Sequence, residues 1–252
     1  MSLLLLGGTA EAKQLARTLQ QRGIDVIYSV AGLVRQPQLD CRVISGGFTQ
    51  FGGLPRFIGD AGVNAILDAT HPYASNMSAT AVAAARDCGI ALWRYQRPAW
   101  QPRTGDDWRE FDDWRELPAL TGAYRAVFLT AGRLSAELAA RLAAPGFGKG
   151  QRQLLRTATR PDFTLPESMT WIEDIGPFTL AAERALFERY GIDALVSKNS
   201  GGDATVAKLE VAREQGLPVF LLRRPRLPAA EREFADLDSC TDFVSARCAV
   251  AV

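Results

Sequence analysis

Short apolar runs alternate with segments of helical periodicity along the whole chain, and this alternation constrains the fold more than any other feature. Residues 3–6 are four consecutive leucines ended by two glycines, a pattern typical of a buried parallel strand. Ala12, Leu15, Ala16 and Leu19 then recur three and four residues apart, as on one face of a helix. The alternation predicts an α/β fold with mainly parallel, doubly wound sheets.

The same patterns predict further strands at residues 24–30, 65–67, 90–95, 126–130, 154–156, 169–172, 194–197 and 218–222. Helices are expected at residues 75–88, 135–143, 177–190, 205–215 and 241–248, with Pro177 in the first turn of its helix. Between the halves, residues 97–118 contain three prolines and three tryptophans and show no clean period. We therefore predict one domain at 1–96, a linker region at 97–118 and a second α/β domain at 119–252.

The composition excludes several classes of protein. A hydrophobic fraction of 47% excludes wholesale disorder, and 29 basic against 28 acidic residues argue against nucleic-acid or polybasic membrane binding. Four cysteines match no zinc spacing and the chain has one histidine, so we expect no metal. The opening apolar run is too short for a signal peptide, and no run approaches ~18 apolar residues. We expect a cytoplasmic protein, a monomer or small homo-oligomer.

The turn Gly7-Gly8-Thr9-Ala10-Glu11 leaves a predicted strand and opens a predicted helix. Backbone N–H groups at such a turn, together with the helix dipole, suit a pyrophosphate. The turn departs from the dinucleotide fingerprint, because Thr9 stands where the second glycine is expected. We predict that these five residues bind a cofactor, and a plain turn without ligand is the alternative.

The second strand ends in Tyr28-Ser29-Val30 without the carboxylate that an NAD-type site places there. Arg35 follows shortly after. A hydroxyl and a cation suit a 2′-phosphate better than a ribose diol, so Ser29 and Arg35 favour NADP over NAD. An ordinary surface loop is the alternative.

Residues 68–74 follow the carboxyl end of another predicted strand, where α/β sheets place ligands. His71, the single histidine, could donate a hydrogen bond or a proton near neutral pH. A structural histidine is the alternative.

A second glycine-rich loop, residues 197–203, follows the predicted strand at 194–197. Lys198, Asn199, Ser200 and Gly201 would make an anion cradle, and a simple helix cap is the alternative.

Together these motifs resemble the precorrin-6A reductase family of cobalamin biosynthesis, including its cobalt-precorrin form. The matching segments are residues 5–12 (LLGGTAEA), 29–32 (SVAG), 45–48 (SGGF), 68–74 (DATHPYA), 94–100 (RYQRPAW) and 197–202 (SKNSGG). They occur in order over most of the chain, and residues 68–74 are the most specific. The departures are Gln50, where a glycine is usual, and Gln96, where an acidic residue is common.

The resemblance implies reduction of one carbon–carbon double bond of a corrin precursor by NADPH, in two Rossmann-like domains with the active site in the interdomain cleft. Gly46 and Gly47 would let the backbone approach the cofactor closely. His71 and Tyr73 are candidate proton donors. The residues expected to bind the polycarboxylate substrate are Thr70, His71, Ala74, Arg94, Arg97, Lys198, Asn199, Ser200 and Gly201.

Two other functions stay open at this point. One is an NADP-dependent reductase of another small metabolite, and the other is a non-catalytic nucleotide-binding α/β module. A methyltransferase-like protein is disfavoured, because no acidic residue ends the second strand to hold a ribose diol.

Overall fold

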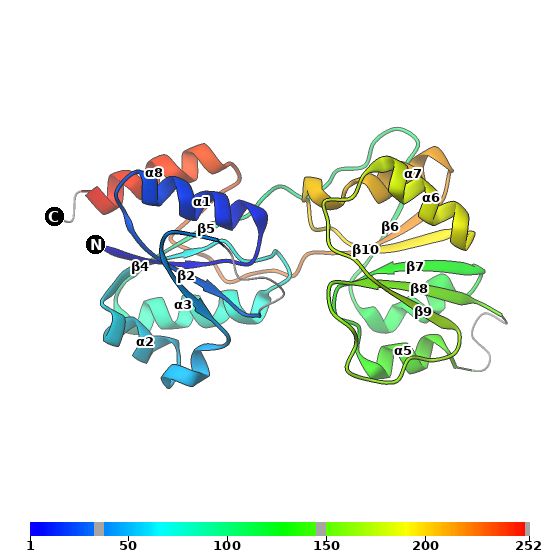
Figure 1. Cartoon of the computed structure of the whole chain (residues 1–252), viewed down its shortest axis with the longest axis horizontal. Coiled ribbons are helices and arrows are strands. Elements are labelled where there is room, and N and C mark those ends of the chain that lie inside the picture. Colours follow the sequence, from blue (N-terminus) through cyan, green and yellow to red (C-terminus); the bar gives the residue numbers. More distant parts are fainter. Residues whose placement is uncertain (33–37, 145–149, 250–252) are drawn as a thin grey trace. The chain divides into compact units, whose positions relative to one another are not determined.

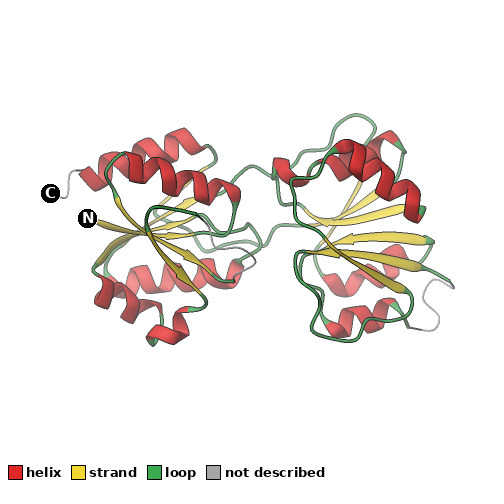
Figure 2. Ribbon diagram, viewed as in Figure 1, coloured by secondary structure: helices red, strands yellow, loops and turns green. Residues whose placement is uncertain are grey.

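The chain folds into two compact units, which Figures 1 and 2 show in the computed structural model. The structure describes residues 1–32, 38–144 and 150–249. Unit 1 comprises residues 1–98 and 225–252, and unit 2 comprises residues 99–224. The expected active site in an interdomain cleft stays a prediction.

Unit 1 is a sheet of six parallel strands with helices on both faces. The strand order is β12 (Arg232–Phe234), β5 (Ala91–Tyr95), β4 (Val63–Asp68), β1 (Ser2–Leu6), β2 (Asp25–Val30) and β3 (Arg42–Ser45). The helices are α1 (Ala10–Gln21) and α8 (Leu237–Ala249) on one face, and α2 (Leu54–Ala61) and α3 (Ser75–Cys88) on the other (Figure 1). A 3₁₀ turn, η1 (Phe48–Phe51), precedes α2.

The leucines of β1 explain why this sheet is covered on both faces. Leu3 and Leu5 pack into the cluster that contains the apolar residues of α1 and α8, whereas Leu4 and Leu6 pack with those of α2 and α3. All four are at most 1% exposed. Burial of each such side chain stabilises the fold by roughly 1.5–3 kcal/mol. The strand β1 therefore contributes to the apolar core on both faces of the sheet.

Unit 2 repeats this architecture with a second sheet of six parallel strands. Their order is β6 (Asp107–Phe111), β11 (Pro218–Leu222), β10 (Ala194–Lys198), β7 (Ala126–Thr130), β8 (Arg152–Thr157) and β9 (Met169–Glu173). The helical segments are η2 (Trp114–Glu116), α4 (Leu117–Thr121), α5 (Ala136–Leu142), α6 (Leu180–Tyr190), η3 (Asp203–Thr205) and α7 (Ala207–Glu214). Among the described residues, no helix is both long and apolar enough to cross a membrane.

The predicted fold class, two Rossmann-like α/β domains with mainly parallel sheets, is confirmed. Every predicted strand is present, and the helix at 75–88 has the expected bounds. The strands β3, β6 and β12 and the helices α2 and α4 were not predicted, nor were the 3₁₀ turns η1 and η2. The helix expected from Pro177 begins at Leu180, because Thr179 is its N-cap and its side chain accepts the N–H of Ala182 at 3.2 Å.

The predicted division of the chain is wrong at two places. The proposed linker region contains β6, which pairs with β11 at the edge of the second sheet and therefore belongs to unit 2. The C-terminal 28 residues, 225–252, return to unit 1 instead of completing the second domain. There β12 pairs with β5, and α8 packs against α1.

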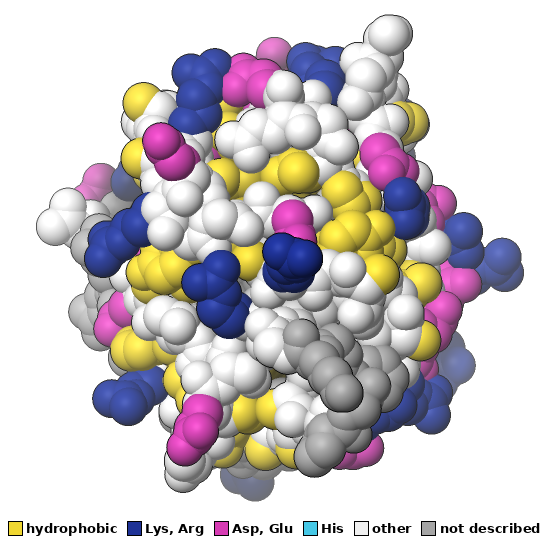
Figure 3. Space-filling model, turned by 90° about the vertical axis from the view of Figure 1, so that its right-hand side faces the viewer, with side chains coloured by type: hydrophobic (Ala, Val, Ile, Leu, Met, Phe, Trp, Pro, Cys, Tyr) yellow, Lys and Arg dark blue, Asp and Glu magenta, His cyan; other side chains and the backbone are white. Residues whose placement is uncertain are grey.

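Positive and negative side chains are mixed on the face that Figure 3 draws. Figure 3 shows Lys and Arg side chains interspersed with Asp and Glu over the face that it draws, with apolar patches between them. This distribution agrees with the net charge of +1. Attraction of an anionic ligand therefore depends on local groups of cations.

Unit 2 encloses a cluster of charged side chains around Lys208, which is 3% exposed. Its Nζ donates to the carbonyl of Thr205 at 2.6 Å and lies 4.9 Å from the centre of the Trp100 ring. The neighbouring pair Arg156–Glu183 is also buried, with 2.7 Å between Nη1 and Oε1. Burial, followed by the charge of Arg156, lowers the pKa of Lys208 to about 7, and Glu183 opposes this shift.

Replacing Lys208 with Met is expected to remove a pH dependence of the free energy of unfolding. An unfolded lysine keeps its proton up to about pH 10.5, whereas folded Lys208 releases it near pH 7. Because the unfolded state binds more protons between these values, the wild-type free energy of unfolding should rise with pH there, by at most ~1.4 kcal/mol per unit. Urea denaturation at pH 6.5, 8 and 9.5 should show this rise for wild type and for the exposed-lysine control Lys13→Met. An equal slope in Lys208→Met would contradict it.

Candidate functional site

The loop after β1 is held in shape by Thr9 and by two glycines. Thr9 is the N-cap of α1: its Oγ1 accepts the N–H of Ala12 at 3.0 Å and donates to the carbonyl of Ala69 at 3.3 Å. Gly8 has φ of +116°, a conformation that glycine adopts without strain. The loop is therefore tied to the end of β4 as well as to α1.

Tyr28, which lies in β2, contacts this loop through its hydroxyl and was not among the predicted site residues. Its hydroxyl accepts the N–H of Gly8 at 3.0 Å, and its side chain is 1% exposed. Burial raises the pKa of this phenol. A Cβ at Gly7 would collide with the Tyr28 ring, so the glycine is required by the packing of the tyrosine. In the sequence, Tyr28 could have been noticed as a tyrosine within a predicted buried strand, where its hydroxyl needs a hydrogen-bond partner.

A cavity of about 340 Å³ opens at the carboxyl edge of the first sheet, and we call it the unit 1 cavity. Its walls come from the ends of β1 and β2, the glycine loop after β3, the loop after β4 and the start of α3. The lining residues are Leu6, Gly7, Gly8, Ser29, Val30, Ala31, Gly32, Gly46, Gly47, Phe48, Thr70, His71, Ala74 and Met77. This edge is where ligands bind in doubly wound sheets.

The predicted cofactor residues fall partly on this cavity. Those that line it are Gly7, Gly8, Ser29, Gly46 and Gly47, and they are joined by Thr70, His71 and Ala74 from the predicted substrate set. Thr9, Ala10 and Glu11 do not line it, and Arg35 lies outside the described residues. The structure therefore brings residues predicted for cofactor and for substrate to one place in unit 1.

Glu11 and Arg97 bind each other beside the unit 1 cavity. Nη1 of Arg97 lies 2.9 and 2.8 Å from the two carboxylate oxygens of Glu11. Burial alone would raise the pKa of Glu11, but hydrogen bonds from its own backbone and from Arg97 hold it below the ordinary value. Glu11 was predicted to bind the cofactor and Arg97 the substrate; the structure shows their ion pair, and both contacts stay predictions.

Asp68 and Arg94 form a buried ion pair at the end of β4 and β5. Nε of Arg94 donates to Oδ2 of Asp68 at 3.1 Å, and both side chains are at most 3% exposed. Oδ1 of Asp68 accepts the hydroxyl of Thr70 at 2.7 Å and its backbone N–H at 3.2 Å. Nη1 of Arg94 also binds Glu233 of β12 at 2.7 Å. Arg94 was predicted to hold a substrate carboxylate; the structure shows its partners within unit 1, and the substrate contact stays a prediction.

His71 lines the unit 1 cavity, and Tyr73 does not. The backbone N–H of Tyr73 donates to Nδ1 of His71 at 3.3 Å, and the two rings are 5.7 Å apart. Because Nδ1 accepts this bond, a neutral His71 carries its proton on Nε2. Of the two predicted proton donors, His71 is thus the one placed at the cavity.

The predicted anion cradle lies in unit 2, after β10. Lys198 ends that strand, and burial lowers the pKa of its amine. The side chain of Asn199 bonds the backbone of Trp100, accepting its N–H at 2.8 Å and donating to its carbonyl at 3.1 Å. Arg224 donates to the carbonyls of Asn199 and Ser200, and Gly201 has φ of +73°. Asn199 therefore joins the loop to the chain at Trp100, and the substrate contact predicted for it stays a prediction.

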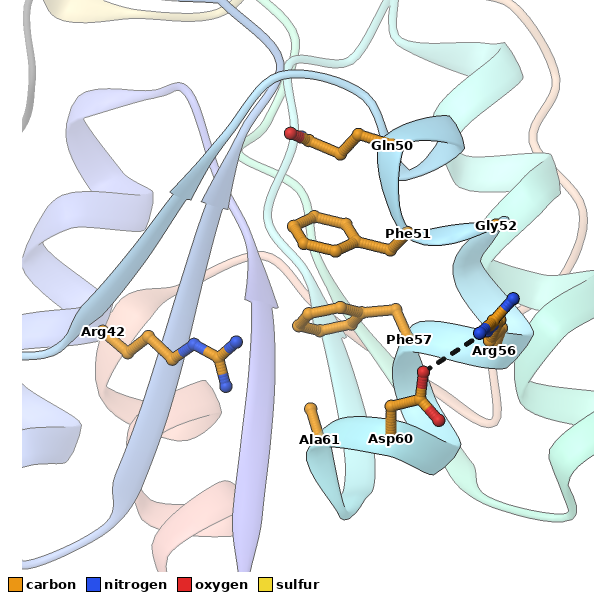
Figure 4. Close-up of a pocket in the computed structure, with 8 residues that line it drawn as sticks. All are labelled: Arg42, Gln50, Phe51, Gly52, Arg56, Phe57, Asp60 and Ala61. Atoms are coloured by element: carbon orange, nitrogen blue, oxygen red, sulfur yellow. Dashed lines mark ion pairs between the residues drawn. The ribbon is translucent and has the colours of Figure 1, made fainter.

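Unit 1 has another cavity of about 310 Å³ beside η1 and α2 (Figure 4). The rings of Phe51 and Phe57 lie one above the other there, with centres 5.0 Å apart, and Arg56 pairs with Asp60 at 3.4 Å. Gln50 above them donates to the carbonyls of Ser45 and Gly47 at 2.9 and 3.0 Å. The departure at Gln50 thus supplies an amide that fixes the Gly46–Gly47 loop of the unit 1 cavity.

Fold and site together define a protein of two Rossmann-like units whose first unit carries a glycine-lined cavity at its strand ends. The family model described as "Precorrin-6x reductase CbiJ/CobK" matches residues 2–245, and the chain belongs to this family. Within the described ranges, no group of three or more His, Cys, Asp or Glu side chains is placed to hold a metal ion.

Individual relatives agree with this assignment. The precorrin-6A reductase of Rhodococcus erythropolis is 40% identical over 247 residues, with 96% of each chain covered. The precorrin-6A reductase of Rhodobacter capsulatus is 39% identical, covering 91% of this chain and 90% of its own. A cobalt-precorrin-6A reductase of Priestia megaterium is 31% identical, covering 89% and 91%. A solved structure of CobK precorrin-6A reductase superposes with a TM-score of 0.85 at 34% identity, covering 98% and 96%.

Gly7→Ala should destabilise unit 1, because the added Cβ collides with the buried ring of Tyr28. Overpacking of this kind costs roughly 1–3 kcal/mol, so the free energy of unfolding in urea should fall by about that amount. Gly32→Ala is the matched control, since Gly32 lines the same cavity but a Cβ there meets nothing within 4 Å. Equal stability of the two variants would show that Tyr28 does not constrain the loop.

Proposed function

We propose that this chain reduces one carbon–carbon double bond of the precorrin-6A macrocycle with NADPH, giving the 6B form in cobalamin biosynthesis. The observation that carries the proposal is the unit 1 cavity, where the predicted glycines and His71 meet at the carboxyl edge of the first sheet. The family and its relatives, which are named for this reduction, support the substrate.

The lining of the unit 1 cavity fits a dinucleotide. Glycines at three of its loops leave backbone without side-chain bulk, so that a cofactor can approach closely. The N-terminus of α1 beside Gly8 favours a phosphate. When bound, the nicotinamide supplies a hydride.

The same lining favours NADPH over NADH. None of its described residues is Asp or Glu, the side chains that would hold a ribose diol. Ser29 presents a hydroxyl instead, and Arg35 follows in the chain. We therefore propose that Ser29 and Arg35 bind the 2′-phosphate.

We propose that His71 supplies the proton that accompanies the hydride. The donor is the imidazolium form of His71, because loss of a proton from the neutral ring would leave an imidazolate. Reduction of the double bond then takes one hydride from the cofactor and one proton from this imidazolium, which becomes neutral imidazole and regains its proton from solvent. The main contribution of the protein is to hold the two reactants in register.

The metal-free macrocycle is the proposed substrate. Relatives named precorrin-6A reductase reach 36–40% identity with this chain, whereas those named cobalt-precorrin-6A reductase reach 25–31%. Comparing kcat/KM for the two macrocycles tests this choice, and a preference for the cobalt form would contradict it. Reduction of another small metabolite is the alternative function.

Mixing the protein with NADPH and precorrin-6A should consume reduced nicotinamide, followed by its absorbance, and form the 6B product. The kcat/KM measured for NADH should be at least about tenfold lower than that for NADPH, because NADH lacks the 2′-phosphate and its contact is lost. The same protein with NADPH but without precorrin-6A gives the background rate of NADPH oxidation. No oxidation above that background with either macrocycle would exclude the reductase and leave the non-catalytic nucleotide-binding module.

His71→Ala should lower kcat by roughly 10²-fold or more, the usual contribution of a positioned proton donor. Tyr73→Phe is the matched control: it keeps the backbone N–H that binds His71 and removes the other candidate hydroxyl. A wild-type kcat in His71→Ala would show that water supplies the proton. A loss confined to Tyr73→Phe would transfer the role to Tyr73.

A further inference from the structure

The cavity beside η1 and α2 takes no part in the proposed reaction (Figure 4), and we call it the η1–α2 cavity. Its walls come from the start of β3, from η1 and from α2. Its volume of about 310 Å³ lies at the lower end of the range for small-molecule sites, roughly 300–1,000 Å³. It shares none of its described lining residues with the unit 1 cavity, so a ligand there would occupy a separate site.

Two aromatic rings form one side of the η1–α2 cavity. Figure 4 shows the rings of Phe51 and Phe57 one above the other, with centres 5.0 Å apart. Phe57 is 2% exposed and belongs to the apolar core, whereas Phe51 is half-buried. Aromatic rings attract each other when their centres are about 4.5–7 Å apart, so the exposed part of Phe51 suits a planar apolar group.

The charged side chains of the cavity leave one cation for a ligand. Arg56 and Asp60 pair with each other at 3.4 Å, so their charges offset. Arg42, at the start of β3, pairs with none of the carboxylates that the structure describes, and its guanidinium lies 5.7 Å from the centre of the Phe57 ring. Because a guanidinium binds a carboxylate with two parallel hydrogen bonds, Arg42 suits an anionic group held beside the rings.

The 3₁₀ turn η1 is a wall that the η1–α2 cavity shares with the unit 1 cavity. Phe48 begins η1 and lines the unit 1 cavity, whereas Phe51 ends η1 and lines the η1–α2 cavity. Phe48 also packs against Phe57, with ring centres 5.3 Å apart. A ligand that restricts the motion of η1 therefore acts on both cavities.

Gln50 forms a second connection between the two cavities. It lies above the two rings in Figure 4, and its Nε2 donates to the carbonyls of Ser45 and Gly47. Its side chain is exposed, so it has rotamer freedom to lose when a ligand packs against it. A ligand in the η1–α2 cavity would order this wall before the cofactor binds, and the two ligands should therefore strengthen each other's binding.

We propose that the η1–α2 cavity is an effector site for a small aromatic carboxylate. The ring of this ligand packs on Phe51, its carboxylate binds Arg42, and its presence tightens the binding of NADPH. The effect on NADPH rests on the proposed function of the unit 1 cavity. The sequence patterns did not predict this site, because Arg42 and Phe51 lie in β3 and η1, and neither element was predicted.

The first experiment titrates the protein with benzoate by isothermal calorimetry, with benzamide and acetate as matched probes. Benzamide keeps the ring without the charge and acetate keeps the charge without the ring, so each should bind at least about tenfold more weakly than benzoate. No binding of benzoate, or equal binding of the three probes, would overturn the proposal.

The same titration on two variants locates the bound benzoate. Arg42→Gln should lower its affinity about tenfold, because a charge-assisted hydrogen bond is lost. The control is Arg86→Gln, which removes an exposed arginine of the same unit that does not line the cavity, and its benzoate affinity should equal that of wild type. A wild-type affinity in Arg42→Gln would overturn the proposal.

The second experiment measures NADPH affinity by fluorescence titration with and without benzoate. Wild type should bind NADPH roughly fivefold more tightly with benzoate, and by reciprocity should bind benzoate more tightly by the same factor with NADPH. Arg42→Gln should lose this gain and keep the wild-type NADPH affinity measured without benzoate.

The outcomes of the second experiment are distinct. An NADPH affinity unchanged by benzoate would overturn the effector role, and a lowered one would place benzoate in the unit 1 cavity and overturn the proposal as well. A loss of NADPH affinity in Arg42→Gln without benzoate would assign Arg42 to the cofactor, with the same consequence. If wild type binds no NADPH at all, the proposed function fails and the effector role falls with it, whereas the benzoate titration still shows whether the η1–α2 cavity binds an aromatic carboxylate.

Discussion

The buried ion pair between Asp68 and Arg94 is the interaction on which the unit 1 cavity depends. Asp68 ends β4, and its carboxylate holds Thr70 at the start of the loop that presents His71. Nε of Arg94 lies 3.1 Å from this carboxylate and neutralises it, and Nη1 of Arg94 also binds Glu233 of β12. Removing one partner of such a pair usually costs about 3–5 kcal/mol, because a buried charge is left uncompensated. The C-terminal segment therefore stabilises a loop that lies far from it in the sequence.

The main chain, more than the side chains, shapes the proposed cofactor site. Gly8 donates its N–H to Tyr28, and the amide of Gln50 donates to the carbonyls of Ser45 and Gly47, on either side of Gly46. Tyr28 and Gln50 thus act on the backbone around the cavity. A site built in this way suits a ligand that is recognised by close approach of its phosphates to peptide groups.

Much of the fold could be predicted because buried parallel strands consist of consecutive apolar residues in the sequence. The three strands that were missed lack such runs: β3 reads Arg-Val-Ile-Ser, β12 contains Arg232 and Glu233, and β6 contains three charged residues. All three are edge strands, so they need no continuous apolar sequence. The return of the chain to unit 1 could not be predicted from β12 for the same reason.

The candidate site could be predicted in part, because residues that directly follow parallel strands lie at the carboxyl edge of the sheet. Glycines and polar residues after strands meet at the carboxyl edge of a sheet, and Gly7, Ser29 and His71 do so. The roles of Arg94 and Arg97 could not be predicted in this way. Their partners Asp68 and Glu11 lie 26 and 86 residues away, and only the folded chain shows that these charges are already paired.

The central claim is that this chain transfers a hydride from a nicotinamide to a precorrin. The most direct measurement is the mass of the product formed from precorrin-6A with NADPH carrying deuterium at both positions of the nicotinamide C4. Transfer of a hydride predicts a product one mass unit heavier than that formed with unlabelled cofactor, with the second hydrogen taken from solvent. A product of unchanged mass would contradict the claim.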